Sequence, residues 1–134
     1  MSTRPRSFAY AVEVDEAWSA RSALGGTAIP ADEEHWAPEH LVLAGLARCS
    51  LTSLRYHCRR AGVELSSRAS VRGTVTRRAE DGRFAFVEIA FEADVAFEPK
   101  PDDEAVAELL VKGERDCFVG ASLTAQPTYD WRVA

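Results

Sequence analysis

Two cysteines in different predicted elements, Cys49 and Cys117, are the residues of this chain best suited to do chemistry. A cysteine reacts as its thiolate, which attacks electrophiles and binds metals. Cys117 stands near the start of a predicted short helix, "DCFVGASLTA", where the helix dipole favours an anion. Cys49 directly follows Arg48, although successive helical side chains point about 100° apart. Free cysteines are also common as small buried hydrophobic residues, so the residues alone leave a reactive and a structural interpretation open.

The most apolar segment, "PEHLVLAGLARCSLTSLRYHCRRAG" (38–62), predicts one long helix that contains Cys49. Glu39 precedes Cys49 by ten residues, which corresponds to about 15 Å along a straight helix. His40 and His57 are also too far along the helix to contact Cys49. Within one chain Glu39 and Cys49 cannot form a site, but two antiparallel copies of this helix could bring them together and cover its excess apolar surface. The alternative is that Glu39 only complements the helix dipole.

Before this helix, the pattern predicts three short strands. Alternating apolar residues indicate strands over 7–14 and 17–24, and Gly25-Gly26 marks a turn. "TAI" (27–29) predicts a third strand, and the polar, acidic segment 30–37 predicts a loop.

After the helix, two alternating runs flank "EDGR", whose Asp81-Gly82 pair is a strong hairpin signal. A helix is expected over about 101–113, then the short helix near Cys117, then a last strand in "TYDWRV" (128–133). Helices separated from antiparallel strands predict an α+β fold, with one domain over residues 1–134. The predicted core face of the second hairpin strand consists of Ala85, Val87, Ile89, Phe91, Ala93 and Val95.

Composition narrows the function classes. The formal net charge of −5 argues against a nucleic-acid partner, which would require a basic face. No apolar run reaches the roughly 18 residues of a membrane span, and the first residues lack the apolar region of a signal peptide. Three cysteines without CxxC or CxxH spacing suit a reducing cytoplasm and predict no metal site.

Two motifs together resemble the OsmC/Ohr family. "PEHLVLAGLARCS" resembles the family's Pro-Glu pair that opens a central helix, with a cysteine ten residues after the Glu. "DCFVGASL" resembles the family's second cysteine segment, typically Cys-Pro-Val-Ser followed by a short helix. The resemblance implies an OsmC-like α+β fold. It also implies an intertwined homodimer, in which antiparallel sheets wrap around two central cysteine-bearing helices and the sites lie at the subunit interface.

The activity implied by this resemblance is a thiol-dependent peroxidase, related in its chemistry to peroxiredoxins, that acts in oxidative-stress defence. It would reduce organic hydroperoxides and, less efficiently, hydrogen peroxide. Cys49 would be the peroxidatic thiolate and Cys117 the resolving cysteine. Glu39 would orient an arginine that stabilises the Cys49 thiolate, and Arg21 is favoured over Arg6 for that role. An external dithiol would reopen the Cys49–Cys117 disulfide, and no metal or flavin cofactor is required.

Three departures from the family pattern favour a rival function. Ser50 follows the first cysteine where an aromatic residue is usual, Phe118 replaces proline, and Gly120 replaces serine. The rival is a non-catalytic OsmC-like dimer that binds a small apolar ligand at the subunit interface. It predicts that Cys117 lies too far from Cys49 to form a disulfide with it.

Overall fold

The computed structural model describes residues 6–25 and 35–134, and the chain divides into two compact units, Met1–Ala37 and Pro38–Ala134. In the first unit, β1 (Val12–Val14) pairs antiparallel with β2 (Ala20–Ser22). The strands predicted over 7–14 and 17–24 are therefore present, but the predicted ranges are too long. Only three residues of each strand pair in the antiparallel ladder. The predicted strand 27–29 and residues 30–34 of the predicted loop lie outside the described residues. The prediction of a single domain over 1–134 stays a prediction.

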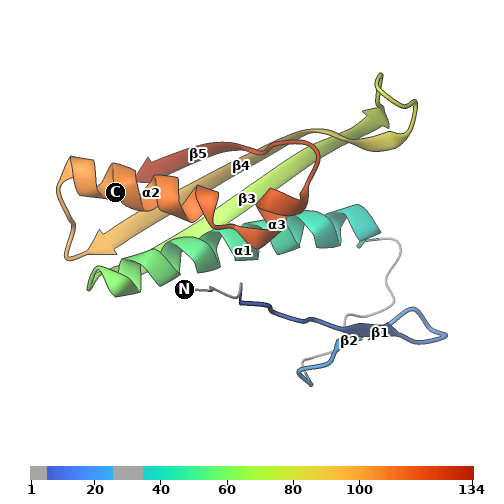
Figure 1. The fold of residues 1–134 in the computed structure, drawn as a ribbon, viewed down its shortest axis with the longest axis horizontal. Helices are drawn as coiled ribbons and strands as arrows, with labels where there is room; N and C mark the ends of the chain where they lie inside the picture. The colour runs from blue at the N-terminus through green and yellow to red at the C-terminus, as the bar shows by residue number, and fades with distance from the viewer. Residues whose placement is uncertain (1–5, 26–34) are drawn as a thin grey trace, which may run out of the picture. The chain divides into compact units, whose positions relative to one another are not determined.

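The second unit is built on a three-stranded sheet in which β4 (Phe84–Glu98) lies between β3 (Glu64–Arg77) and β5 (Thr128–Val133) (Figure 1). The predicted hairpin is confirmed: β3 and β4 are antiparallel, and Gly82 in their turn has a φ of +70°, which favours glycine. The prediction of only antiparallel strands is wrong, because β5 runs parallel to β4. The intervening helices form the crossover connection that parallel neighbours require.

A β-bulge in β4 changes which side chains face the core. The register shifts between Thr74 and Val75, and this leaves Val87 without a pairing partner. Val87 is consequently exposed, contrary to the sequence prediction, and Phe86 packs against the core in its place. Gly73 makes room for Phe86, since a Cβ on Gly73 would lie 2.7 Å from the ring. Beyond the bulge the predicted core face is confirmed by four buried residues: Ile89, Phe91, Ala93 and Val95.

The long predicted helix is present as α1 (Pro38–Arg60). Gly62, with a φ of +73°, ends it in a Schellman motif: the Gly62 N–H donates to the Arg59 carbonyl and the Val63 N–H donates to the Cys58 carbonyl. The buried side chains of α1 form one stripe, while Leu41 and Val42 in its first turns remain exposed. Within residues 6–25 and 35–134, no helix has the length and apolar character needed to cross a membrane.

Two further helices follow β4, as predicted. Asp102 caps α2 (Asp103–Arg115) by accepting a hydrogen bond from the Ala105 N–H, and Cys117 is the N-cap of α3 (Phe118–Ser122). The largest core cluster joins α1, β4 and α2, through residues that include Leu54, Phe91 and Leu109. A smaller cluster joins α1, β4 and the start of α3, with Leu46, Ile89 and Cys117 as its buried members. This second cluster contains Cys117, and Cys49 packs against it.

Candidate active site

The second cysteine is held at the junction between α2 and α3. Cys117 has an extended backbone, with φ −76° and ψ 111°, and its Sγ accepts a hydrogen bond from the Gly120 N–H at 3.3 Å. Its side chain is 0% exposed. The prediction that a short helix begins near Cys117 is confirmed, and that helix turns a backbone donor toward the sulfur.

The first cysteine approaches the same short helix from α1, which lies beside α3 in Figure 1. Cys49 is partly buried, and its Sγ accepts a hydrogen bond from the Val119 N–H at 3.4 Å. Its neighbours in the smaller core cluster are apolar and include Leu43 and Phe86. Backbone N–H groups of α3 thus contact the sulfur atoms of both cysteines.

The surroundings of Cys49 within this unit favour its neutral thiol. Burial raises the pKa of Cys49, and the Val119 N–H offsets part of this increase. Cys117 is close enough to raise the Cys49 pKa further, by hydrogen bonding and by charge.

Ser50 links Cys117 to the last strand. Its hydroxyl donates to Cys117 Sγ at 3.3 Å and is hydrogen-bonded to the Tyr129 hydroxyl at 3.2 Å. Burial raises the pKa of Tyr129, and the bond to Ser50 offsets part of this increase. Sequence reasoning recorded Ser50 only as a departure from a pattern and did not identify Tyr129. The sequence signal for Ser50 was weak: a hydroxyl directly after a cysteine in a helix that also contains Thr52 and Ser53.

Gly120 allows the close approach of these groups. A Cβ at this position would lie 3.2 Å from the Tyr129 hydroxyl oxygen and 3.4 Å from Cys117 Sγ. Because a real Cβ rarely makes so short a contact, one of these neighbours would have to move. Gly120 and Ser50, which both depart from the family pattern, therefore lie next to the same atom, the Cys117 sulfur.

The residue before Cys117 is fixed by ion pairs. His57 Nε2 lies 2.7 Å from Asp116 Oδ2, and Arg115 donates to both Asp116 oxygens at 2.8 Å. The Arg115 guanidinium, together with His57, lowers the pKa of Asp116 to about 2, against the effect of burial. His57 thus connects α1 to the segment that carries Cys117.

Glu39, which was also predicted for the site, cannot contact Cys49 within the same helix. Glu39 is exposed in the first turn of α1, and the same continuous helix places Cys49 about 15 Å further along its axis. Arg21 lies in β2 of the N-terminal unit, and Arg6 lies over the ring of Phe8, 5.3 Å from its centroid. The roles predicted for Glu39, Arg21 and Arg6 stay predictions.

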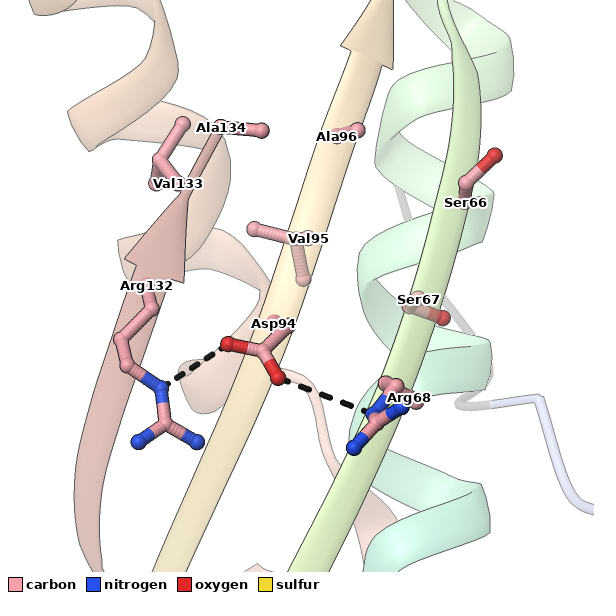
Figure 2. A pocket seen from close by; sticks show the side chains of 9 residues that line it. All are labelled: Ser66, Ser67, Arg68, Asp94, Val95, Ala96, Arg132, Val133 and Ala134. Carbon is pink, nitrogen blue, oxygen red and sulfur yellow. Dashed lines mark hydrogen bonds and ion pairs between the residues drawn. The ribbon is translucent and has the colours of Figure 1, made fainter.

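A separate hollow of about 530 Å³ lies on the sheet face opposite the helices (Figure 2). Asp94 lies at its centre and pairs with Arg132 at 2.9 Å and with Arg68 at 3.7 Å. No cysteine lines this hollow, and its charges already pair with one another. In the part of the chain that the structure describes, no three His, Cys, Asp or Glu side chains are grouped closely enough to hold a metal ion.

Comparisons with known proteins identify the family of the chain and structures with a similar fold. The family model described as OsmC-like protein matches residues 31–132. The fold is similar to that of an OsmC-like protein of unknown function from Vibrio cholerae, with a TM-score of 0.75, 11% identity, and coverage of 93% of this chain and 99% of the other. It is also similar to the OsmC-like protein of Mycoplasma pneumoniae, with a TM-score of 0.69, 16% identity and 98% coverage of both chains.

An organic hydroperoxide resistance protein of Bacillus subtilis shares the fold as well, with a TM-score of 0.59, 18% identity, and coverage of 95% of this chain and 98% of that one. A search of curated protein sequences gave no match. Identities this low show the fold alone, whereas the family model spans most of the sequence. The chain belongs to the OsmC-like protein family.

Proposed function

We propose that this protein is a thiol-dependent peroxidase that reduces organic hydroperoxides, and hydrogen peroxide less efficiently, through Cys49 and Cys117. The observation that carries the proposal is the meeting of two free cysteines at one short helix. Val119 of α3 donates to Cys49, while Cys117 caps the same helix and perturbs the Cys49 thiol. The apolar neighbours of Cys49 suit a substrate with a hydrophobic tail.

The chemistry proceeds in three balanced steps. The Cys49 thiolate attacks the terminal peroxide oxygen and the O–O bond breaks, so that Cys49 becomes a sulfenic acid and the leaving alkoxide takes a proton from water to give the alcohol. The Cys117 thiol then attacks the Cys49 sulfur, and a disulfide forms as the hydroxyl leaves with the thiol proton as water. An external dithiol reduces this disulfide by thiol–disulfide exchange. The two cysteines and the dithiol carry all the electrons, so these steps need no metal or flavin.

The active unit in this proposal is a homodimer. One protomer leaves Leu41 and Val42 of α1 exposed, and Val12 and Val14 of β1 are more than 60% exposed. Burying this apolar surface against a second copy would stabilise the dimer. It would also allow Glu39 of one protomer to orient an arginine, with Arg21 the first candidate, beside Cys49 of the other. That cation would counter the effect of burial on the Cys49 pKa.

The test is the intact mass and the thiol count of the full chain after one equivalent of cumene hydroperoxide. We expect the loss of two protons and two thiols, with no such loss in Cys49→Ser or Cys117→Ser. Cys58→Ser is the matched control, because Cys58 is buried in the larger core cluster away from α3. Thiols that survive prolonged exposure would contradict the peroxidase and favour the ligand-binding dimer.

A further inference from the structure

The Cys117 sulfur has two hydrogen-bond donors inside the protein. Ser50 Oγ and the Gly120 N–H each lie 3.3 Å from Sγ, and both Ser50 and Cys117 are 0% exposed. A buried sulfur anion loses the solvation of water, and donors that point at it replace that solvation. A thiol has a single proton to donate and is a weak acceptor, so two donors suit the thiolate better than the thiol.

The Ser50 hydroxyl belongs to a longer chain of hydrogen bonds. Because Ser50 donates its single proton to Cys117, its oxygen accepts the proton of the Tyr129 hydroxyl. The Tyr129 ring is held in place by Phe91, at 4.9 Å between centroids, and by stacking on Trp131 at 5.8 Å. Trp131 is anchored in turn by its Nε1–H, which donates to Glu114 at 2.8 Å. With the Ser50 proton on the sulfur, this relay of hydrogen bonds runs from Tyr129 through Ser50 to Cys117.

The two departures from the family pattern act together in this relay. Ser50 supplies a hydroxyl to the sulfur from α1, and Gly120 leaves the space in which the Tyr129 hydroxyl sits. A serine at position 120 would introduce a Cβ 3.2 Å from that hydroxyl oxygen. Ser50 and Gly120 therefore form a matched pair around Cys117.

We propose that Ser50 and Tyr129 are positioning residues that stabilise the Cys117 thiolate and so make Cys117 the leaving group when the disulfide is reduced. This inference rests on the proposed Cys49–Cys117 disulfide. A thiolate of the external dithiol attacks Cys49 Sγ, the more exposed sulfur, and forms a mixed disulfide with it. The Cys49–Cys117 bond breaks, and its electron pair leaves on Cys117, where Ser50 and Gly120 donate to it. The second thiol of the reductant then displaces Cys49. A better stabilised thiolate leaves faster.

The experiment compares Ser50→Ala and Tyr129→Phe with Ser53→Ala. Ser53 is a matched control, since it is a buried serine of the same helix whose hydroxyl has no hydrogen-bond partner among the described residues. One readout is the fraction of Cys117 present as thiolate between pH 6 and 10, followed by the Cβ chemical shift of labelled cysteine in a Cys49→Ser, Cys58→Ser background. The other is the rate at which dithiothreitol reduces a disulfide formed beforehand with diamide.

We expect about tenfold less Cys117 thiolate at a given pH in Ser50→Ala, a smaller decrease in Tyr129→Phe, and none in Ser53→Ala, since Ser50→Ala removes a hydrogen bond to the charged sulfur. Reduction should slow in the same order. An unchanged thiolate fraction or an unchanged reduction rate in a folded Ser50→Ala or Tyr129→Phe protein would overturn the inference. Neither readout uses a peroxide, so a failure of peroxidase activity alone is recognised separately, by hydroperoxide consumption of the unmodified chain.

Discussion

The two cysteines of the site differ in how much of their surroundings one protomer provides. Cys117 is fully enclosed, with donors from Ser50 and Gly120 on its sulfur. Cys49 is partly exposed, accepts a hydrogen bond from the Val119 N–H, and has a pKa that burial raises. Within the described unit Pro38–Ala134, the Cys117 sulfur is therefore enclosed and hydrogen-bonded, whereas the contacts of Cys49 favour its neutral thiol. In the proposed dimer, the partner protomer would supply the cation beside Cys49 and would have little effect on Cys117.

The largest effect that would separate the two thiols is expected for Glu39→Gln. If Glu39 orients a cation beside Cys49, the substitution should raise the Cys49 pKa and slow the reaction with cumene hydroperoxide about tenfold for each unit of that rise at neutral pH. The Cys117 thiolate fraction should not change. Glu104→Gln is the matched control, because Glu104 is an exposed glutamate in the first turn of α2. Stopped-flow kinetics measure the rate.

Mixed dimers determine whether Glu39 acts across the subunit interface. Glu39→Gln and Cys49→Ser chains, each impaired alone, should together form dimers in which one of the two sites has both Glu39 and Cys49. Activity would then recover toward half of the unmodified value. No recovery in confirmed mixed dimers would show that Glu39 does not act on the partner's cysteine.

A smaller effect, confined to the Cys117 side, is expected for Gly120→Ala. The added Cβ crowds the Tyr129 hydroxyl, which its aromatic neighbours hold in place, and overpacking of this kind costs about 1–3 kcal/mol. Alanine recovers about 1 kcal/mol of helix propensity, so a net destabilisation of up to about 2 kcal/mol is expected. Urea unfolding measures it. If the NMR Cβ chemical shift of Cys49 changed in Gly120→Ala while that of Cys117 did not, the effect would not be confined to the Cys117 side.

The smallest effect is a pH dependence at Asp116, next to Cys117. Its pKa of about 2 lies below the roughly 3.9 of an unfolded aspartate, so ionised Asp116 stabilises the fold above about pH 4. That contribution should be lost as the pH falls from about 4 to 2, and Asp116→Asn should lack this part of the acid sensitivity. The effect is modest because the side chain is 39% exposed. Thermal unfolding at pH 5 and pH 2.5 measures the loss of stability in the unmodified chain and in Asp116→Asn. Equal losses in the two proteins would contradict a stabilising role of the ion pairs of Asp116.

Several features of the fold followed from the sequence, because they depend on local chemistry. The extent of α1 follows from Pro38 at its first position and Gly62 just after its end, and the β3–β4 hairpin follows from Asp81-Gly82. The two cysteine motifs indicated the family that the sequence model confirms. The bulge at Val87 and the parallel pairing of β5 were not predicted, since both depend on how distant strands align.

At the site, the sequence by itself determined which thiols exist, that Cys117 begins a short helix, and that Glu39 lies too far along α1 to contact Cys49. Only the tertiary structure decided that Val119 donates to Cys49 and that Ser50, Gly120 and Tyr129 converge on Cys117. The physical reason is that helix geometry fixes distances within one element, whereas contacts between elements depend on packing. Ser50 and Tyr129 are 79 residues apart, and no local pattern relates them.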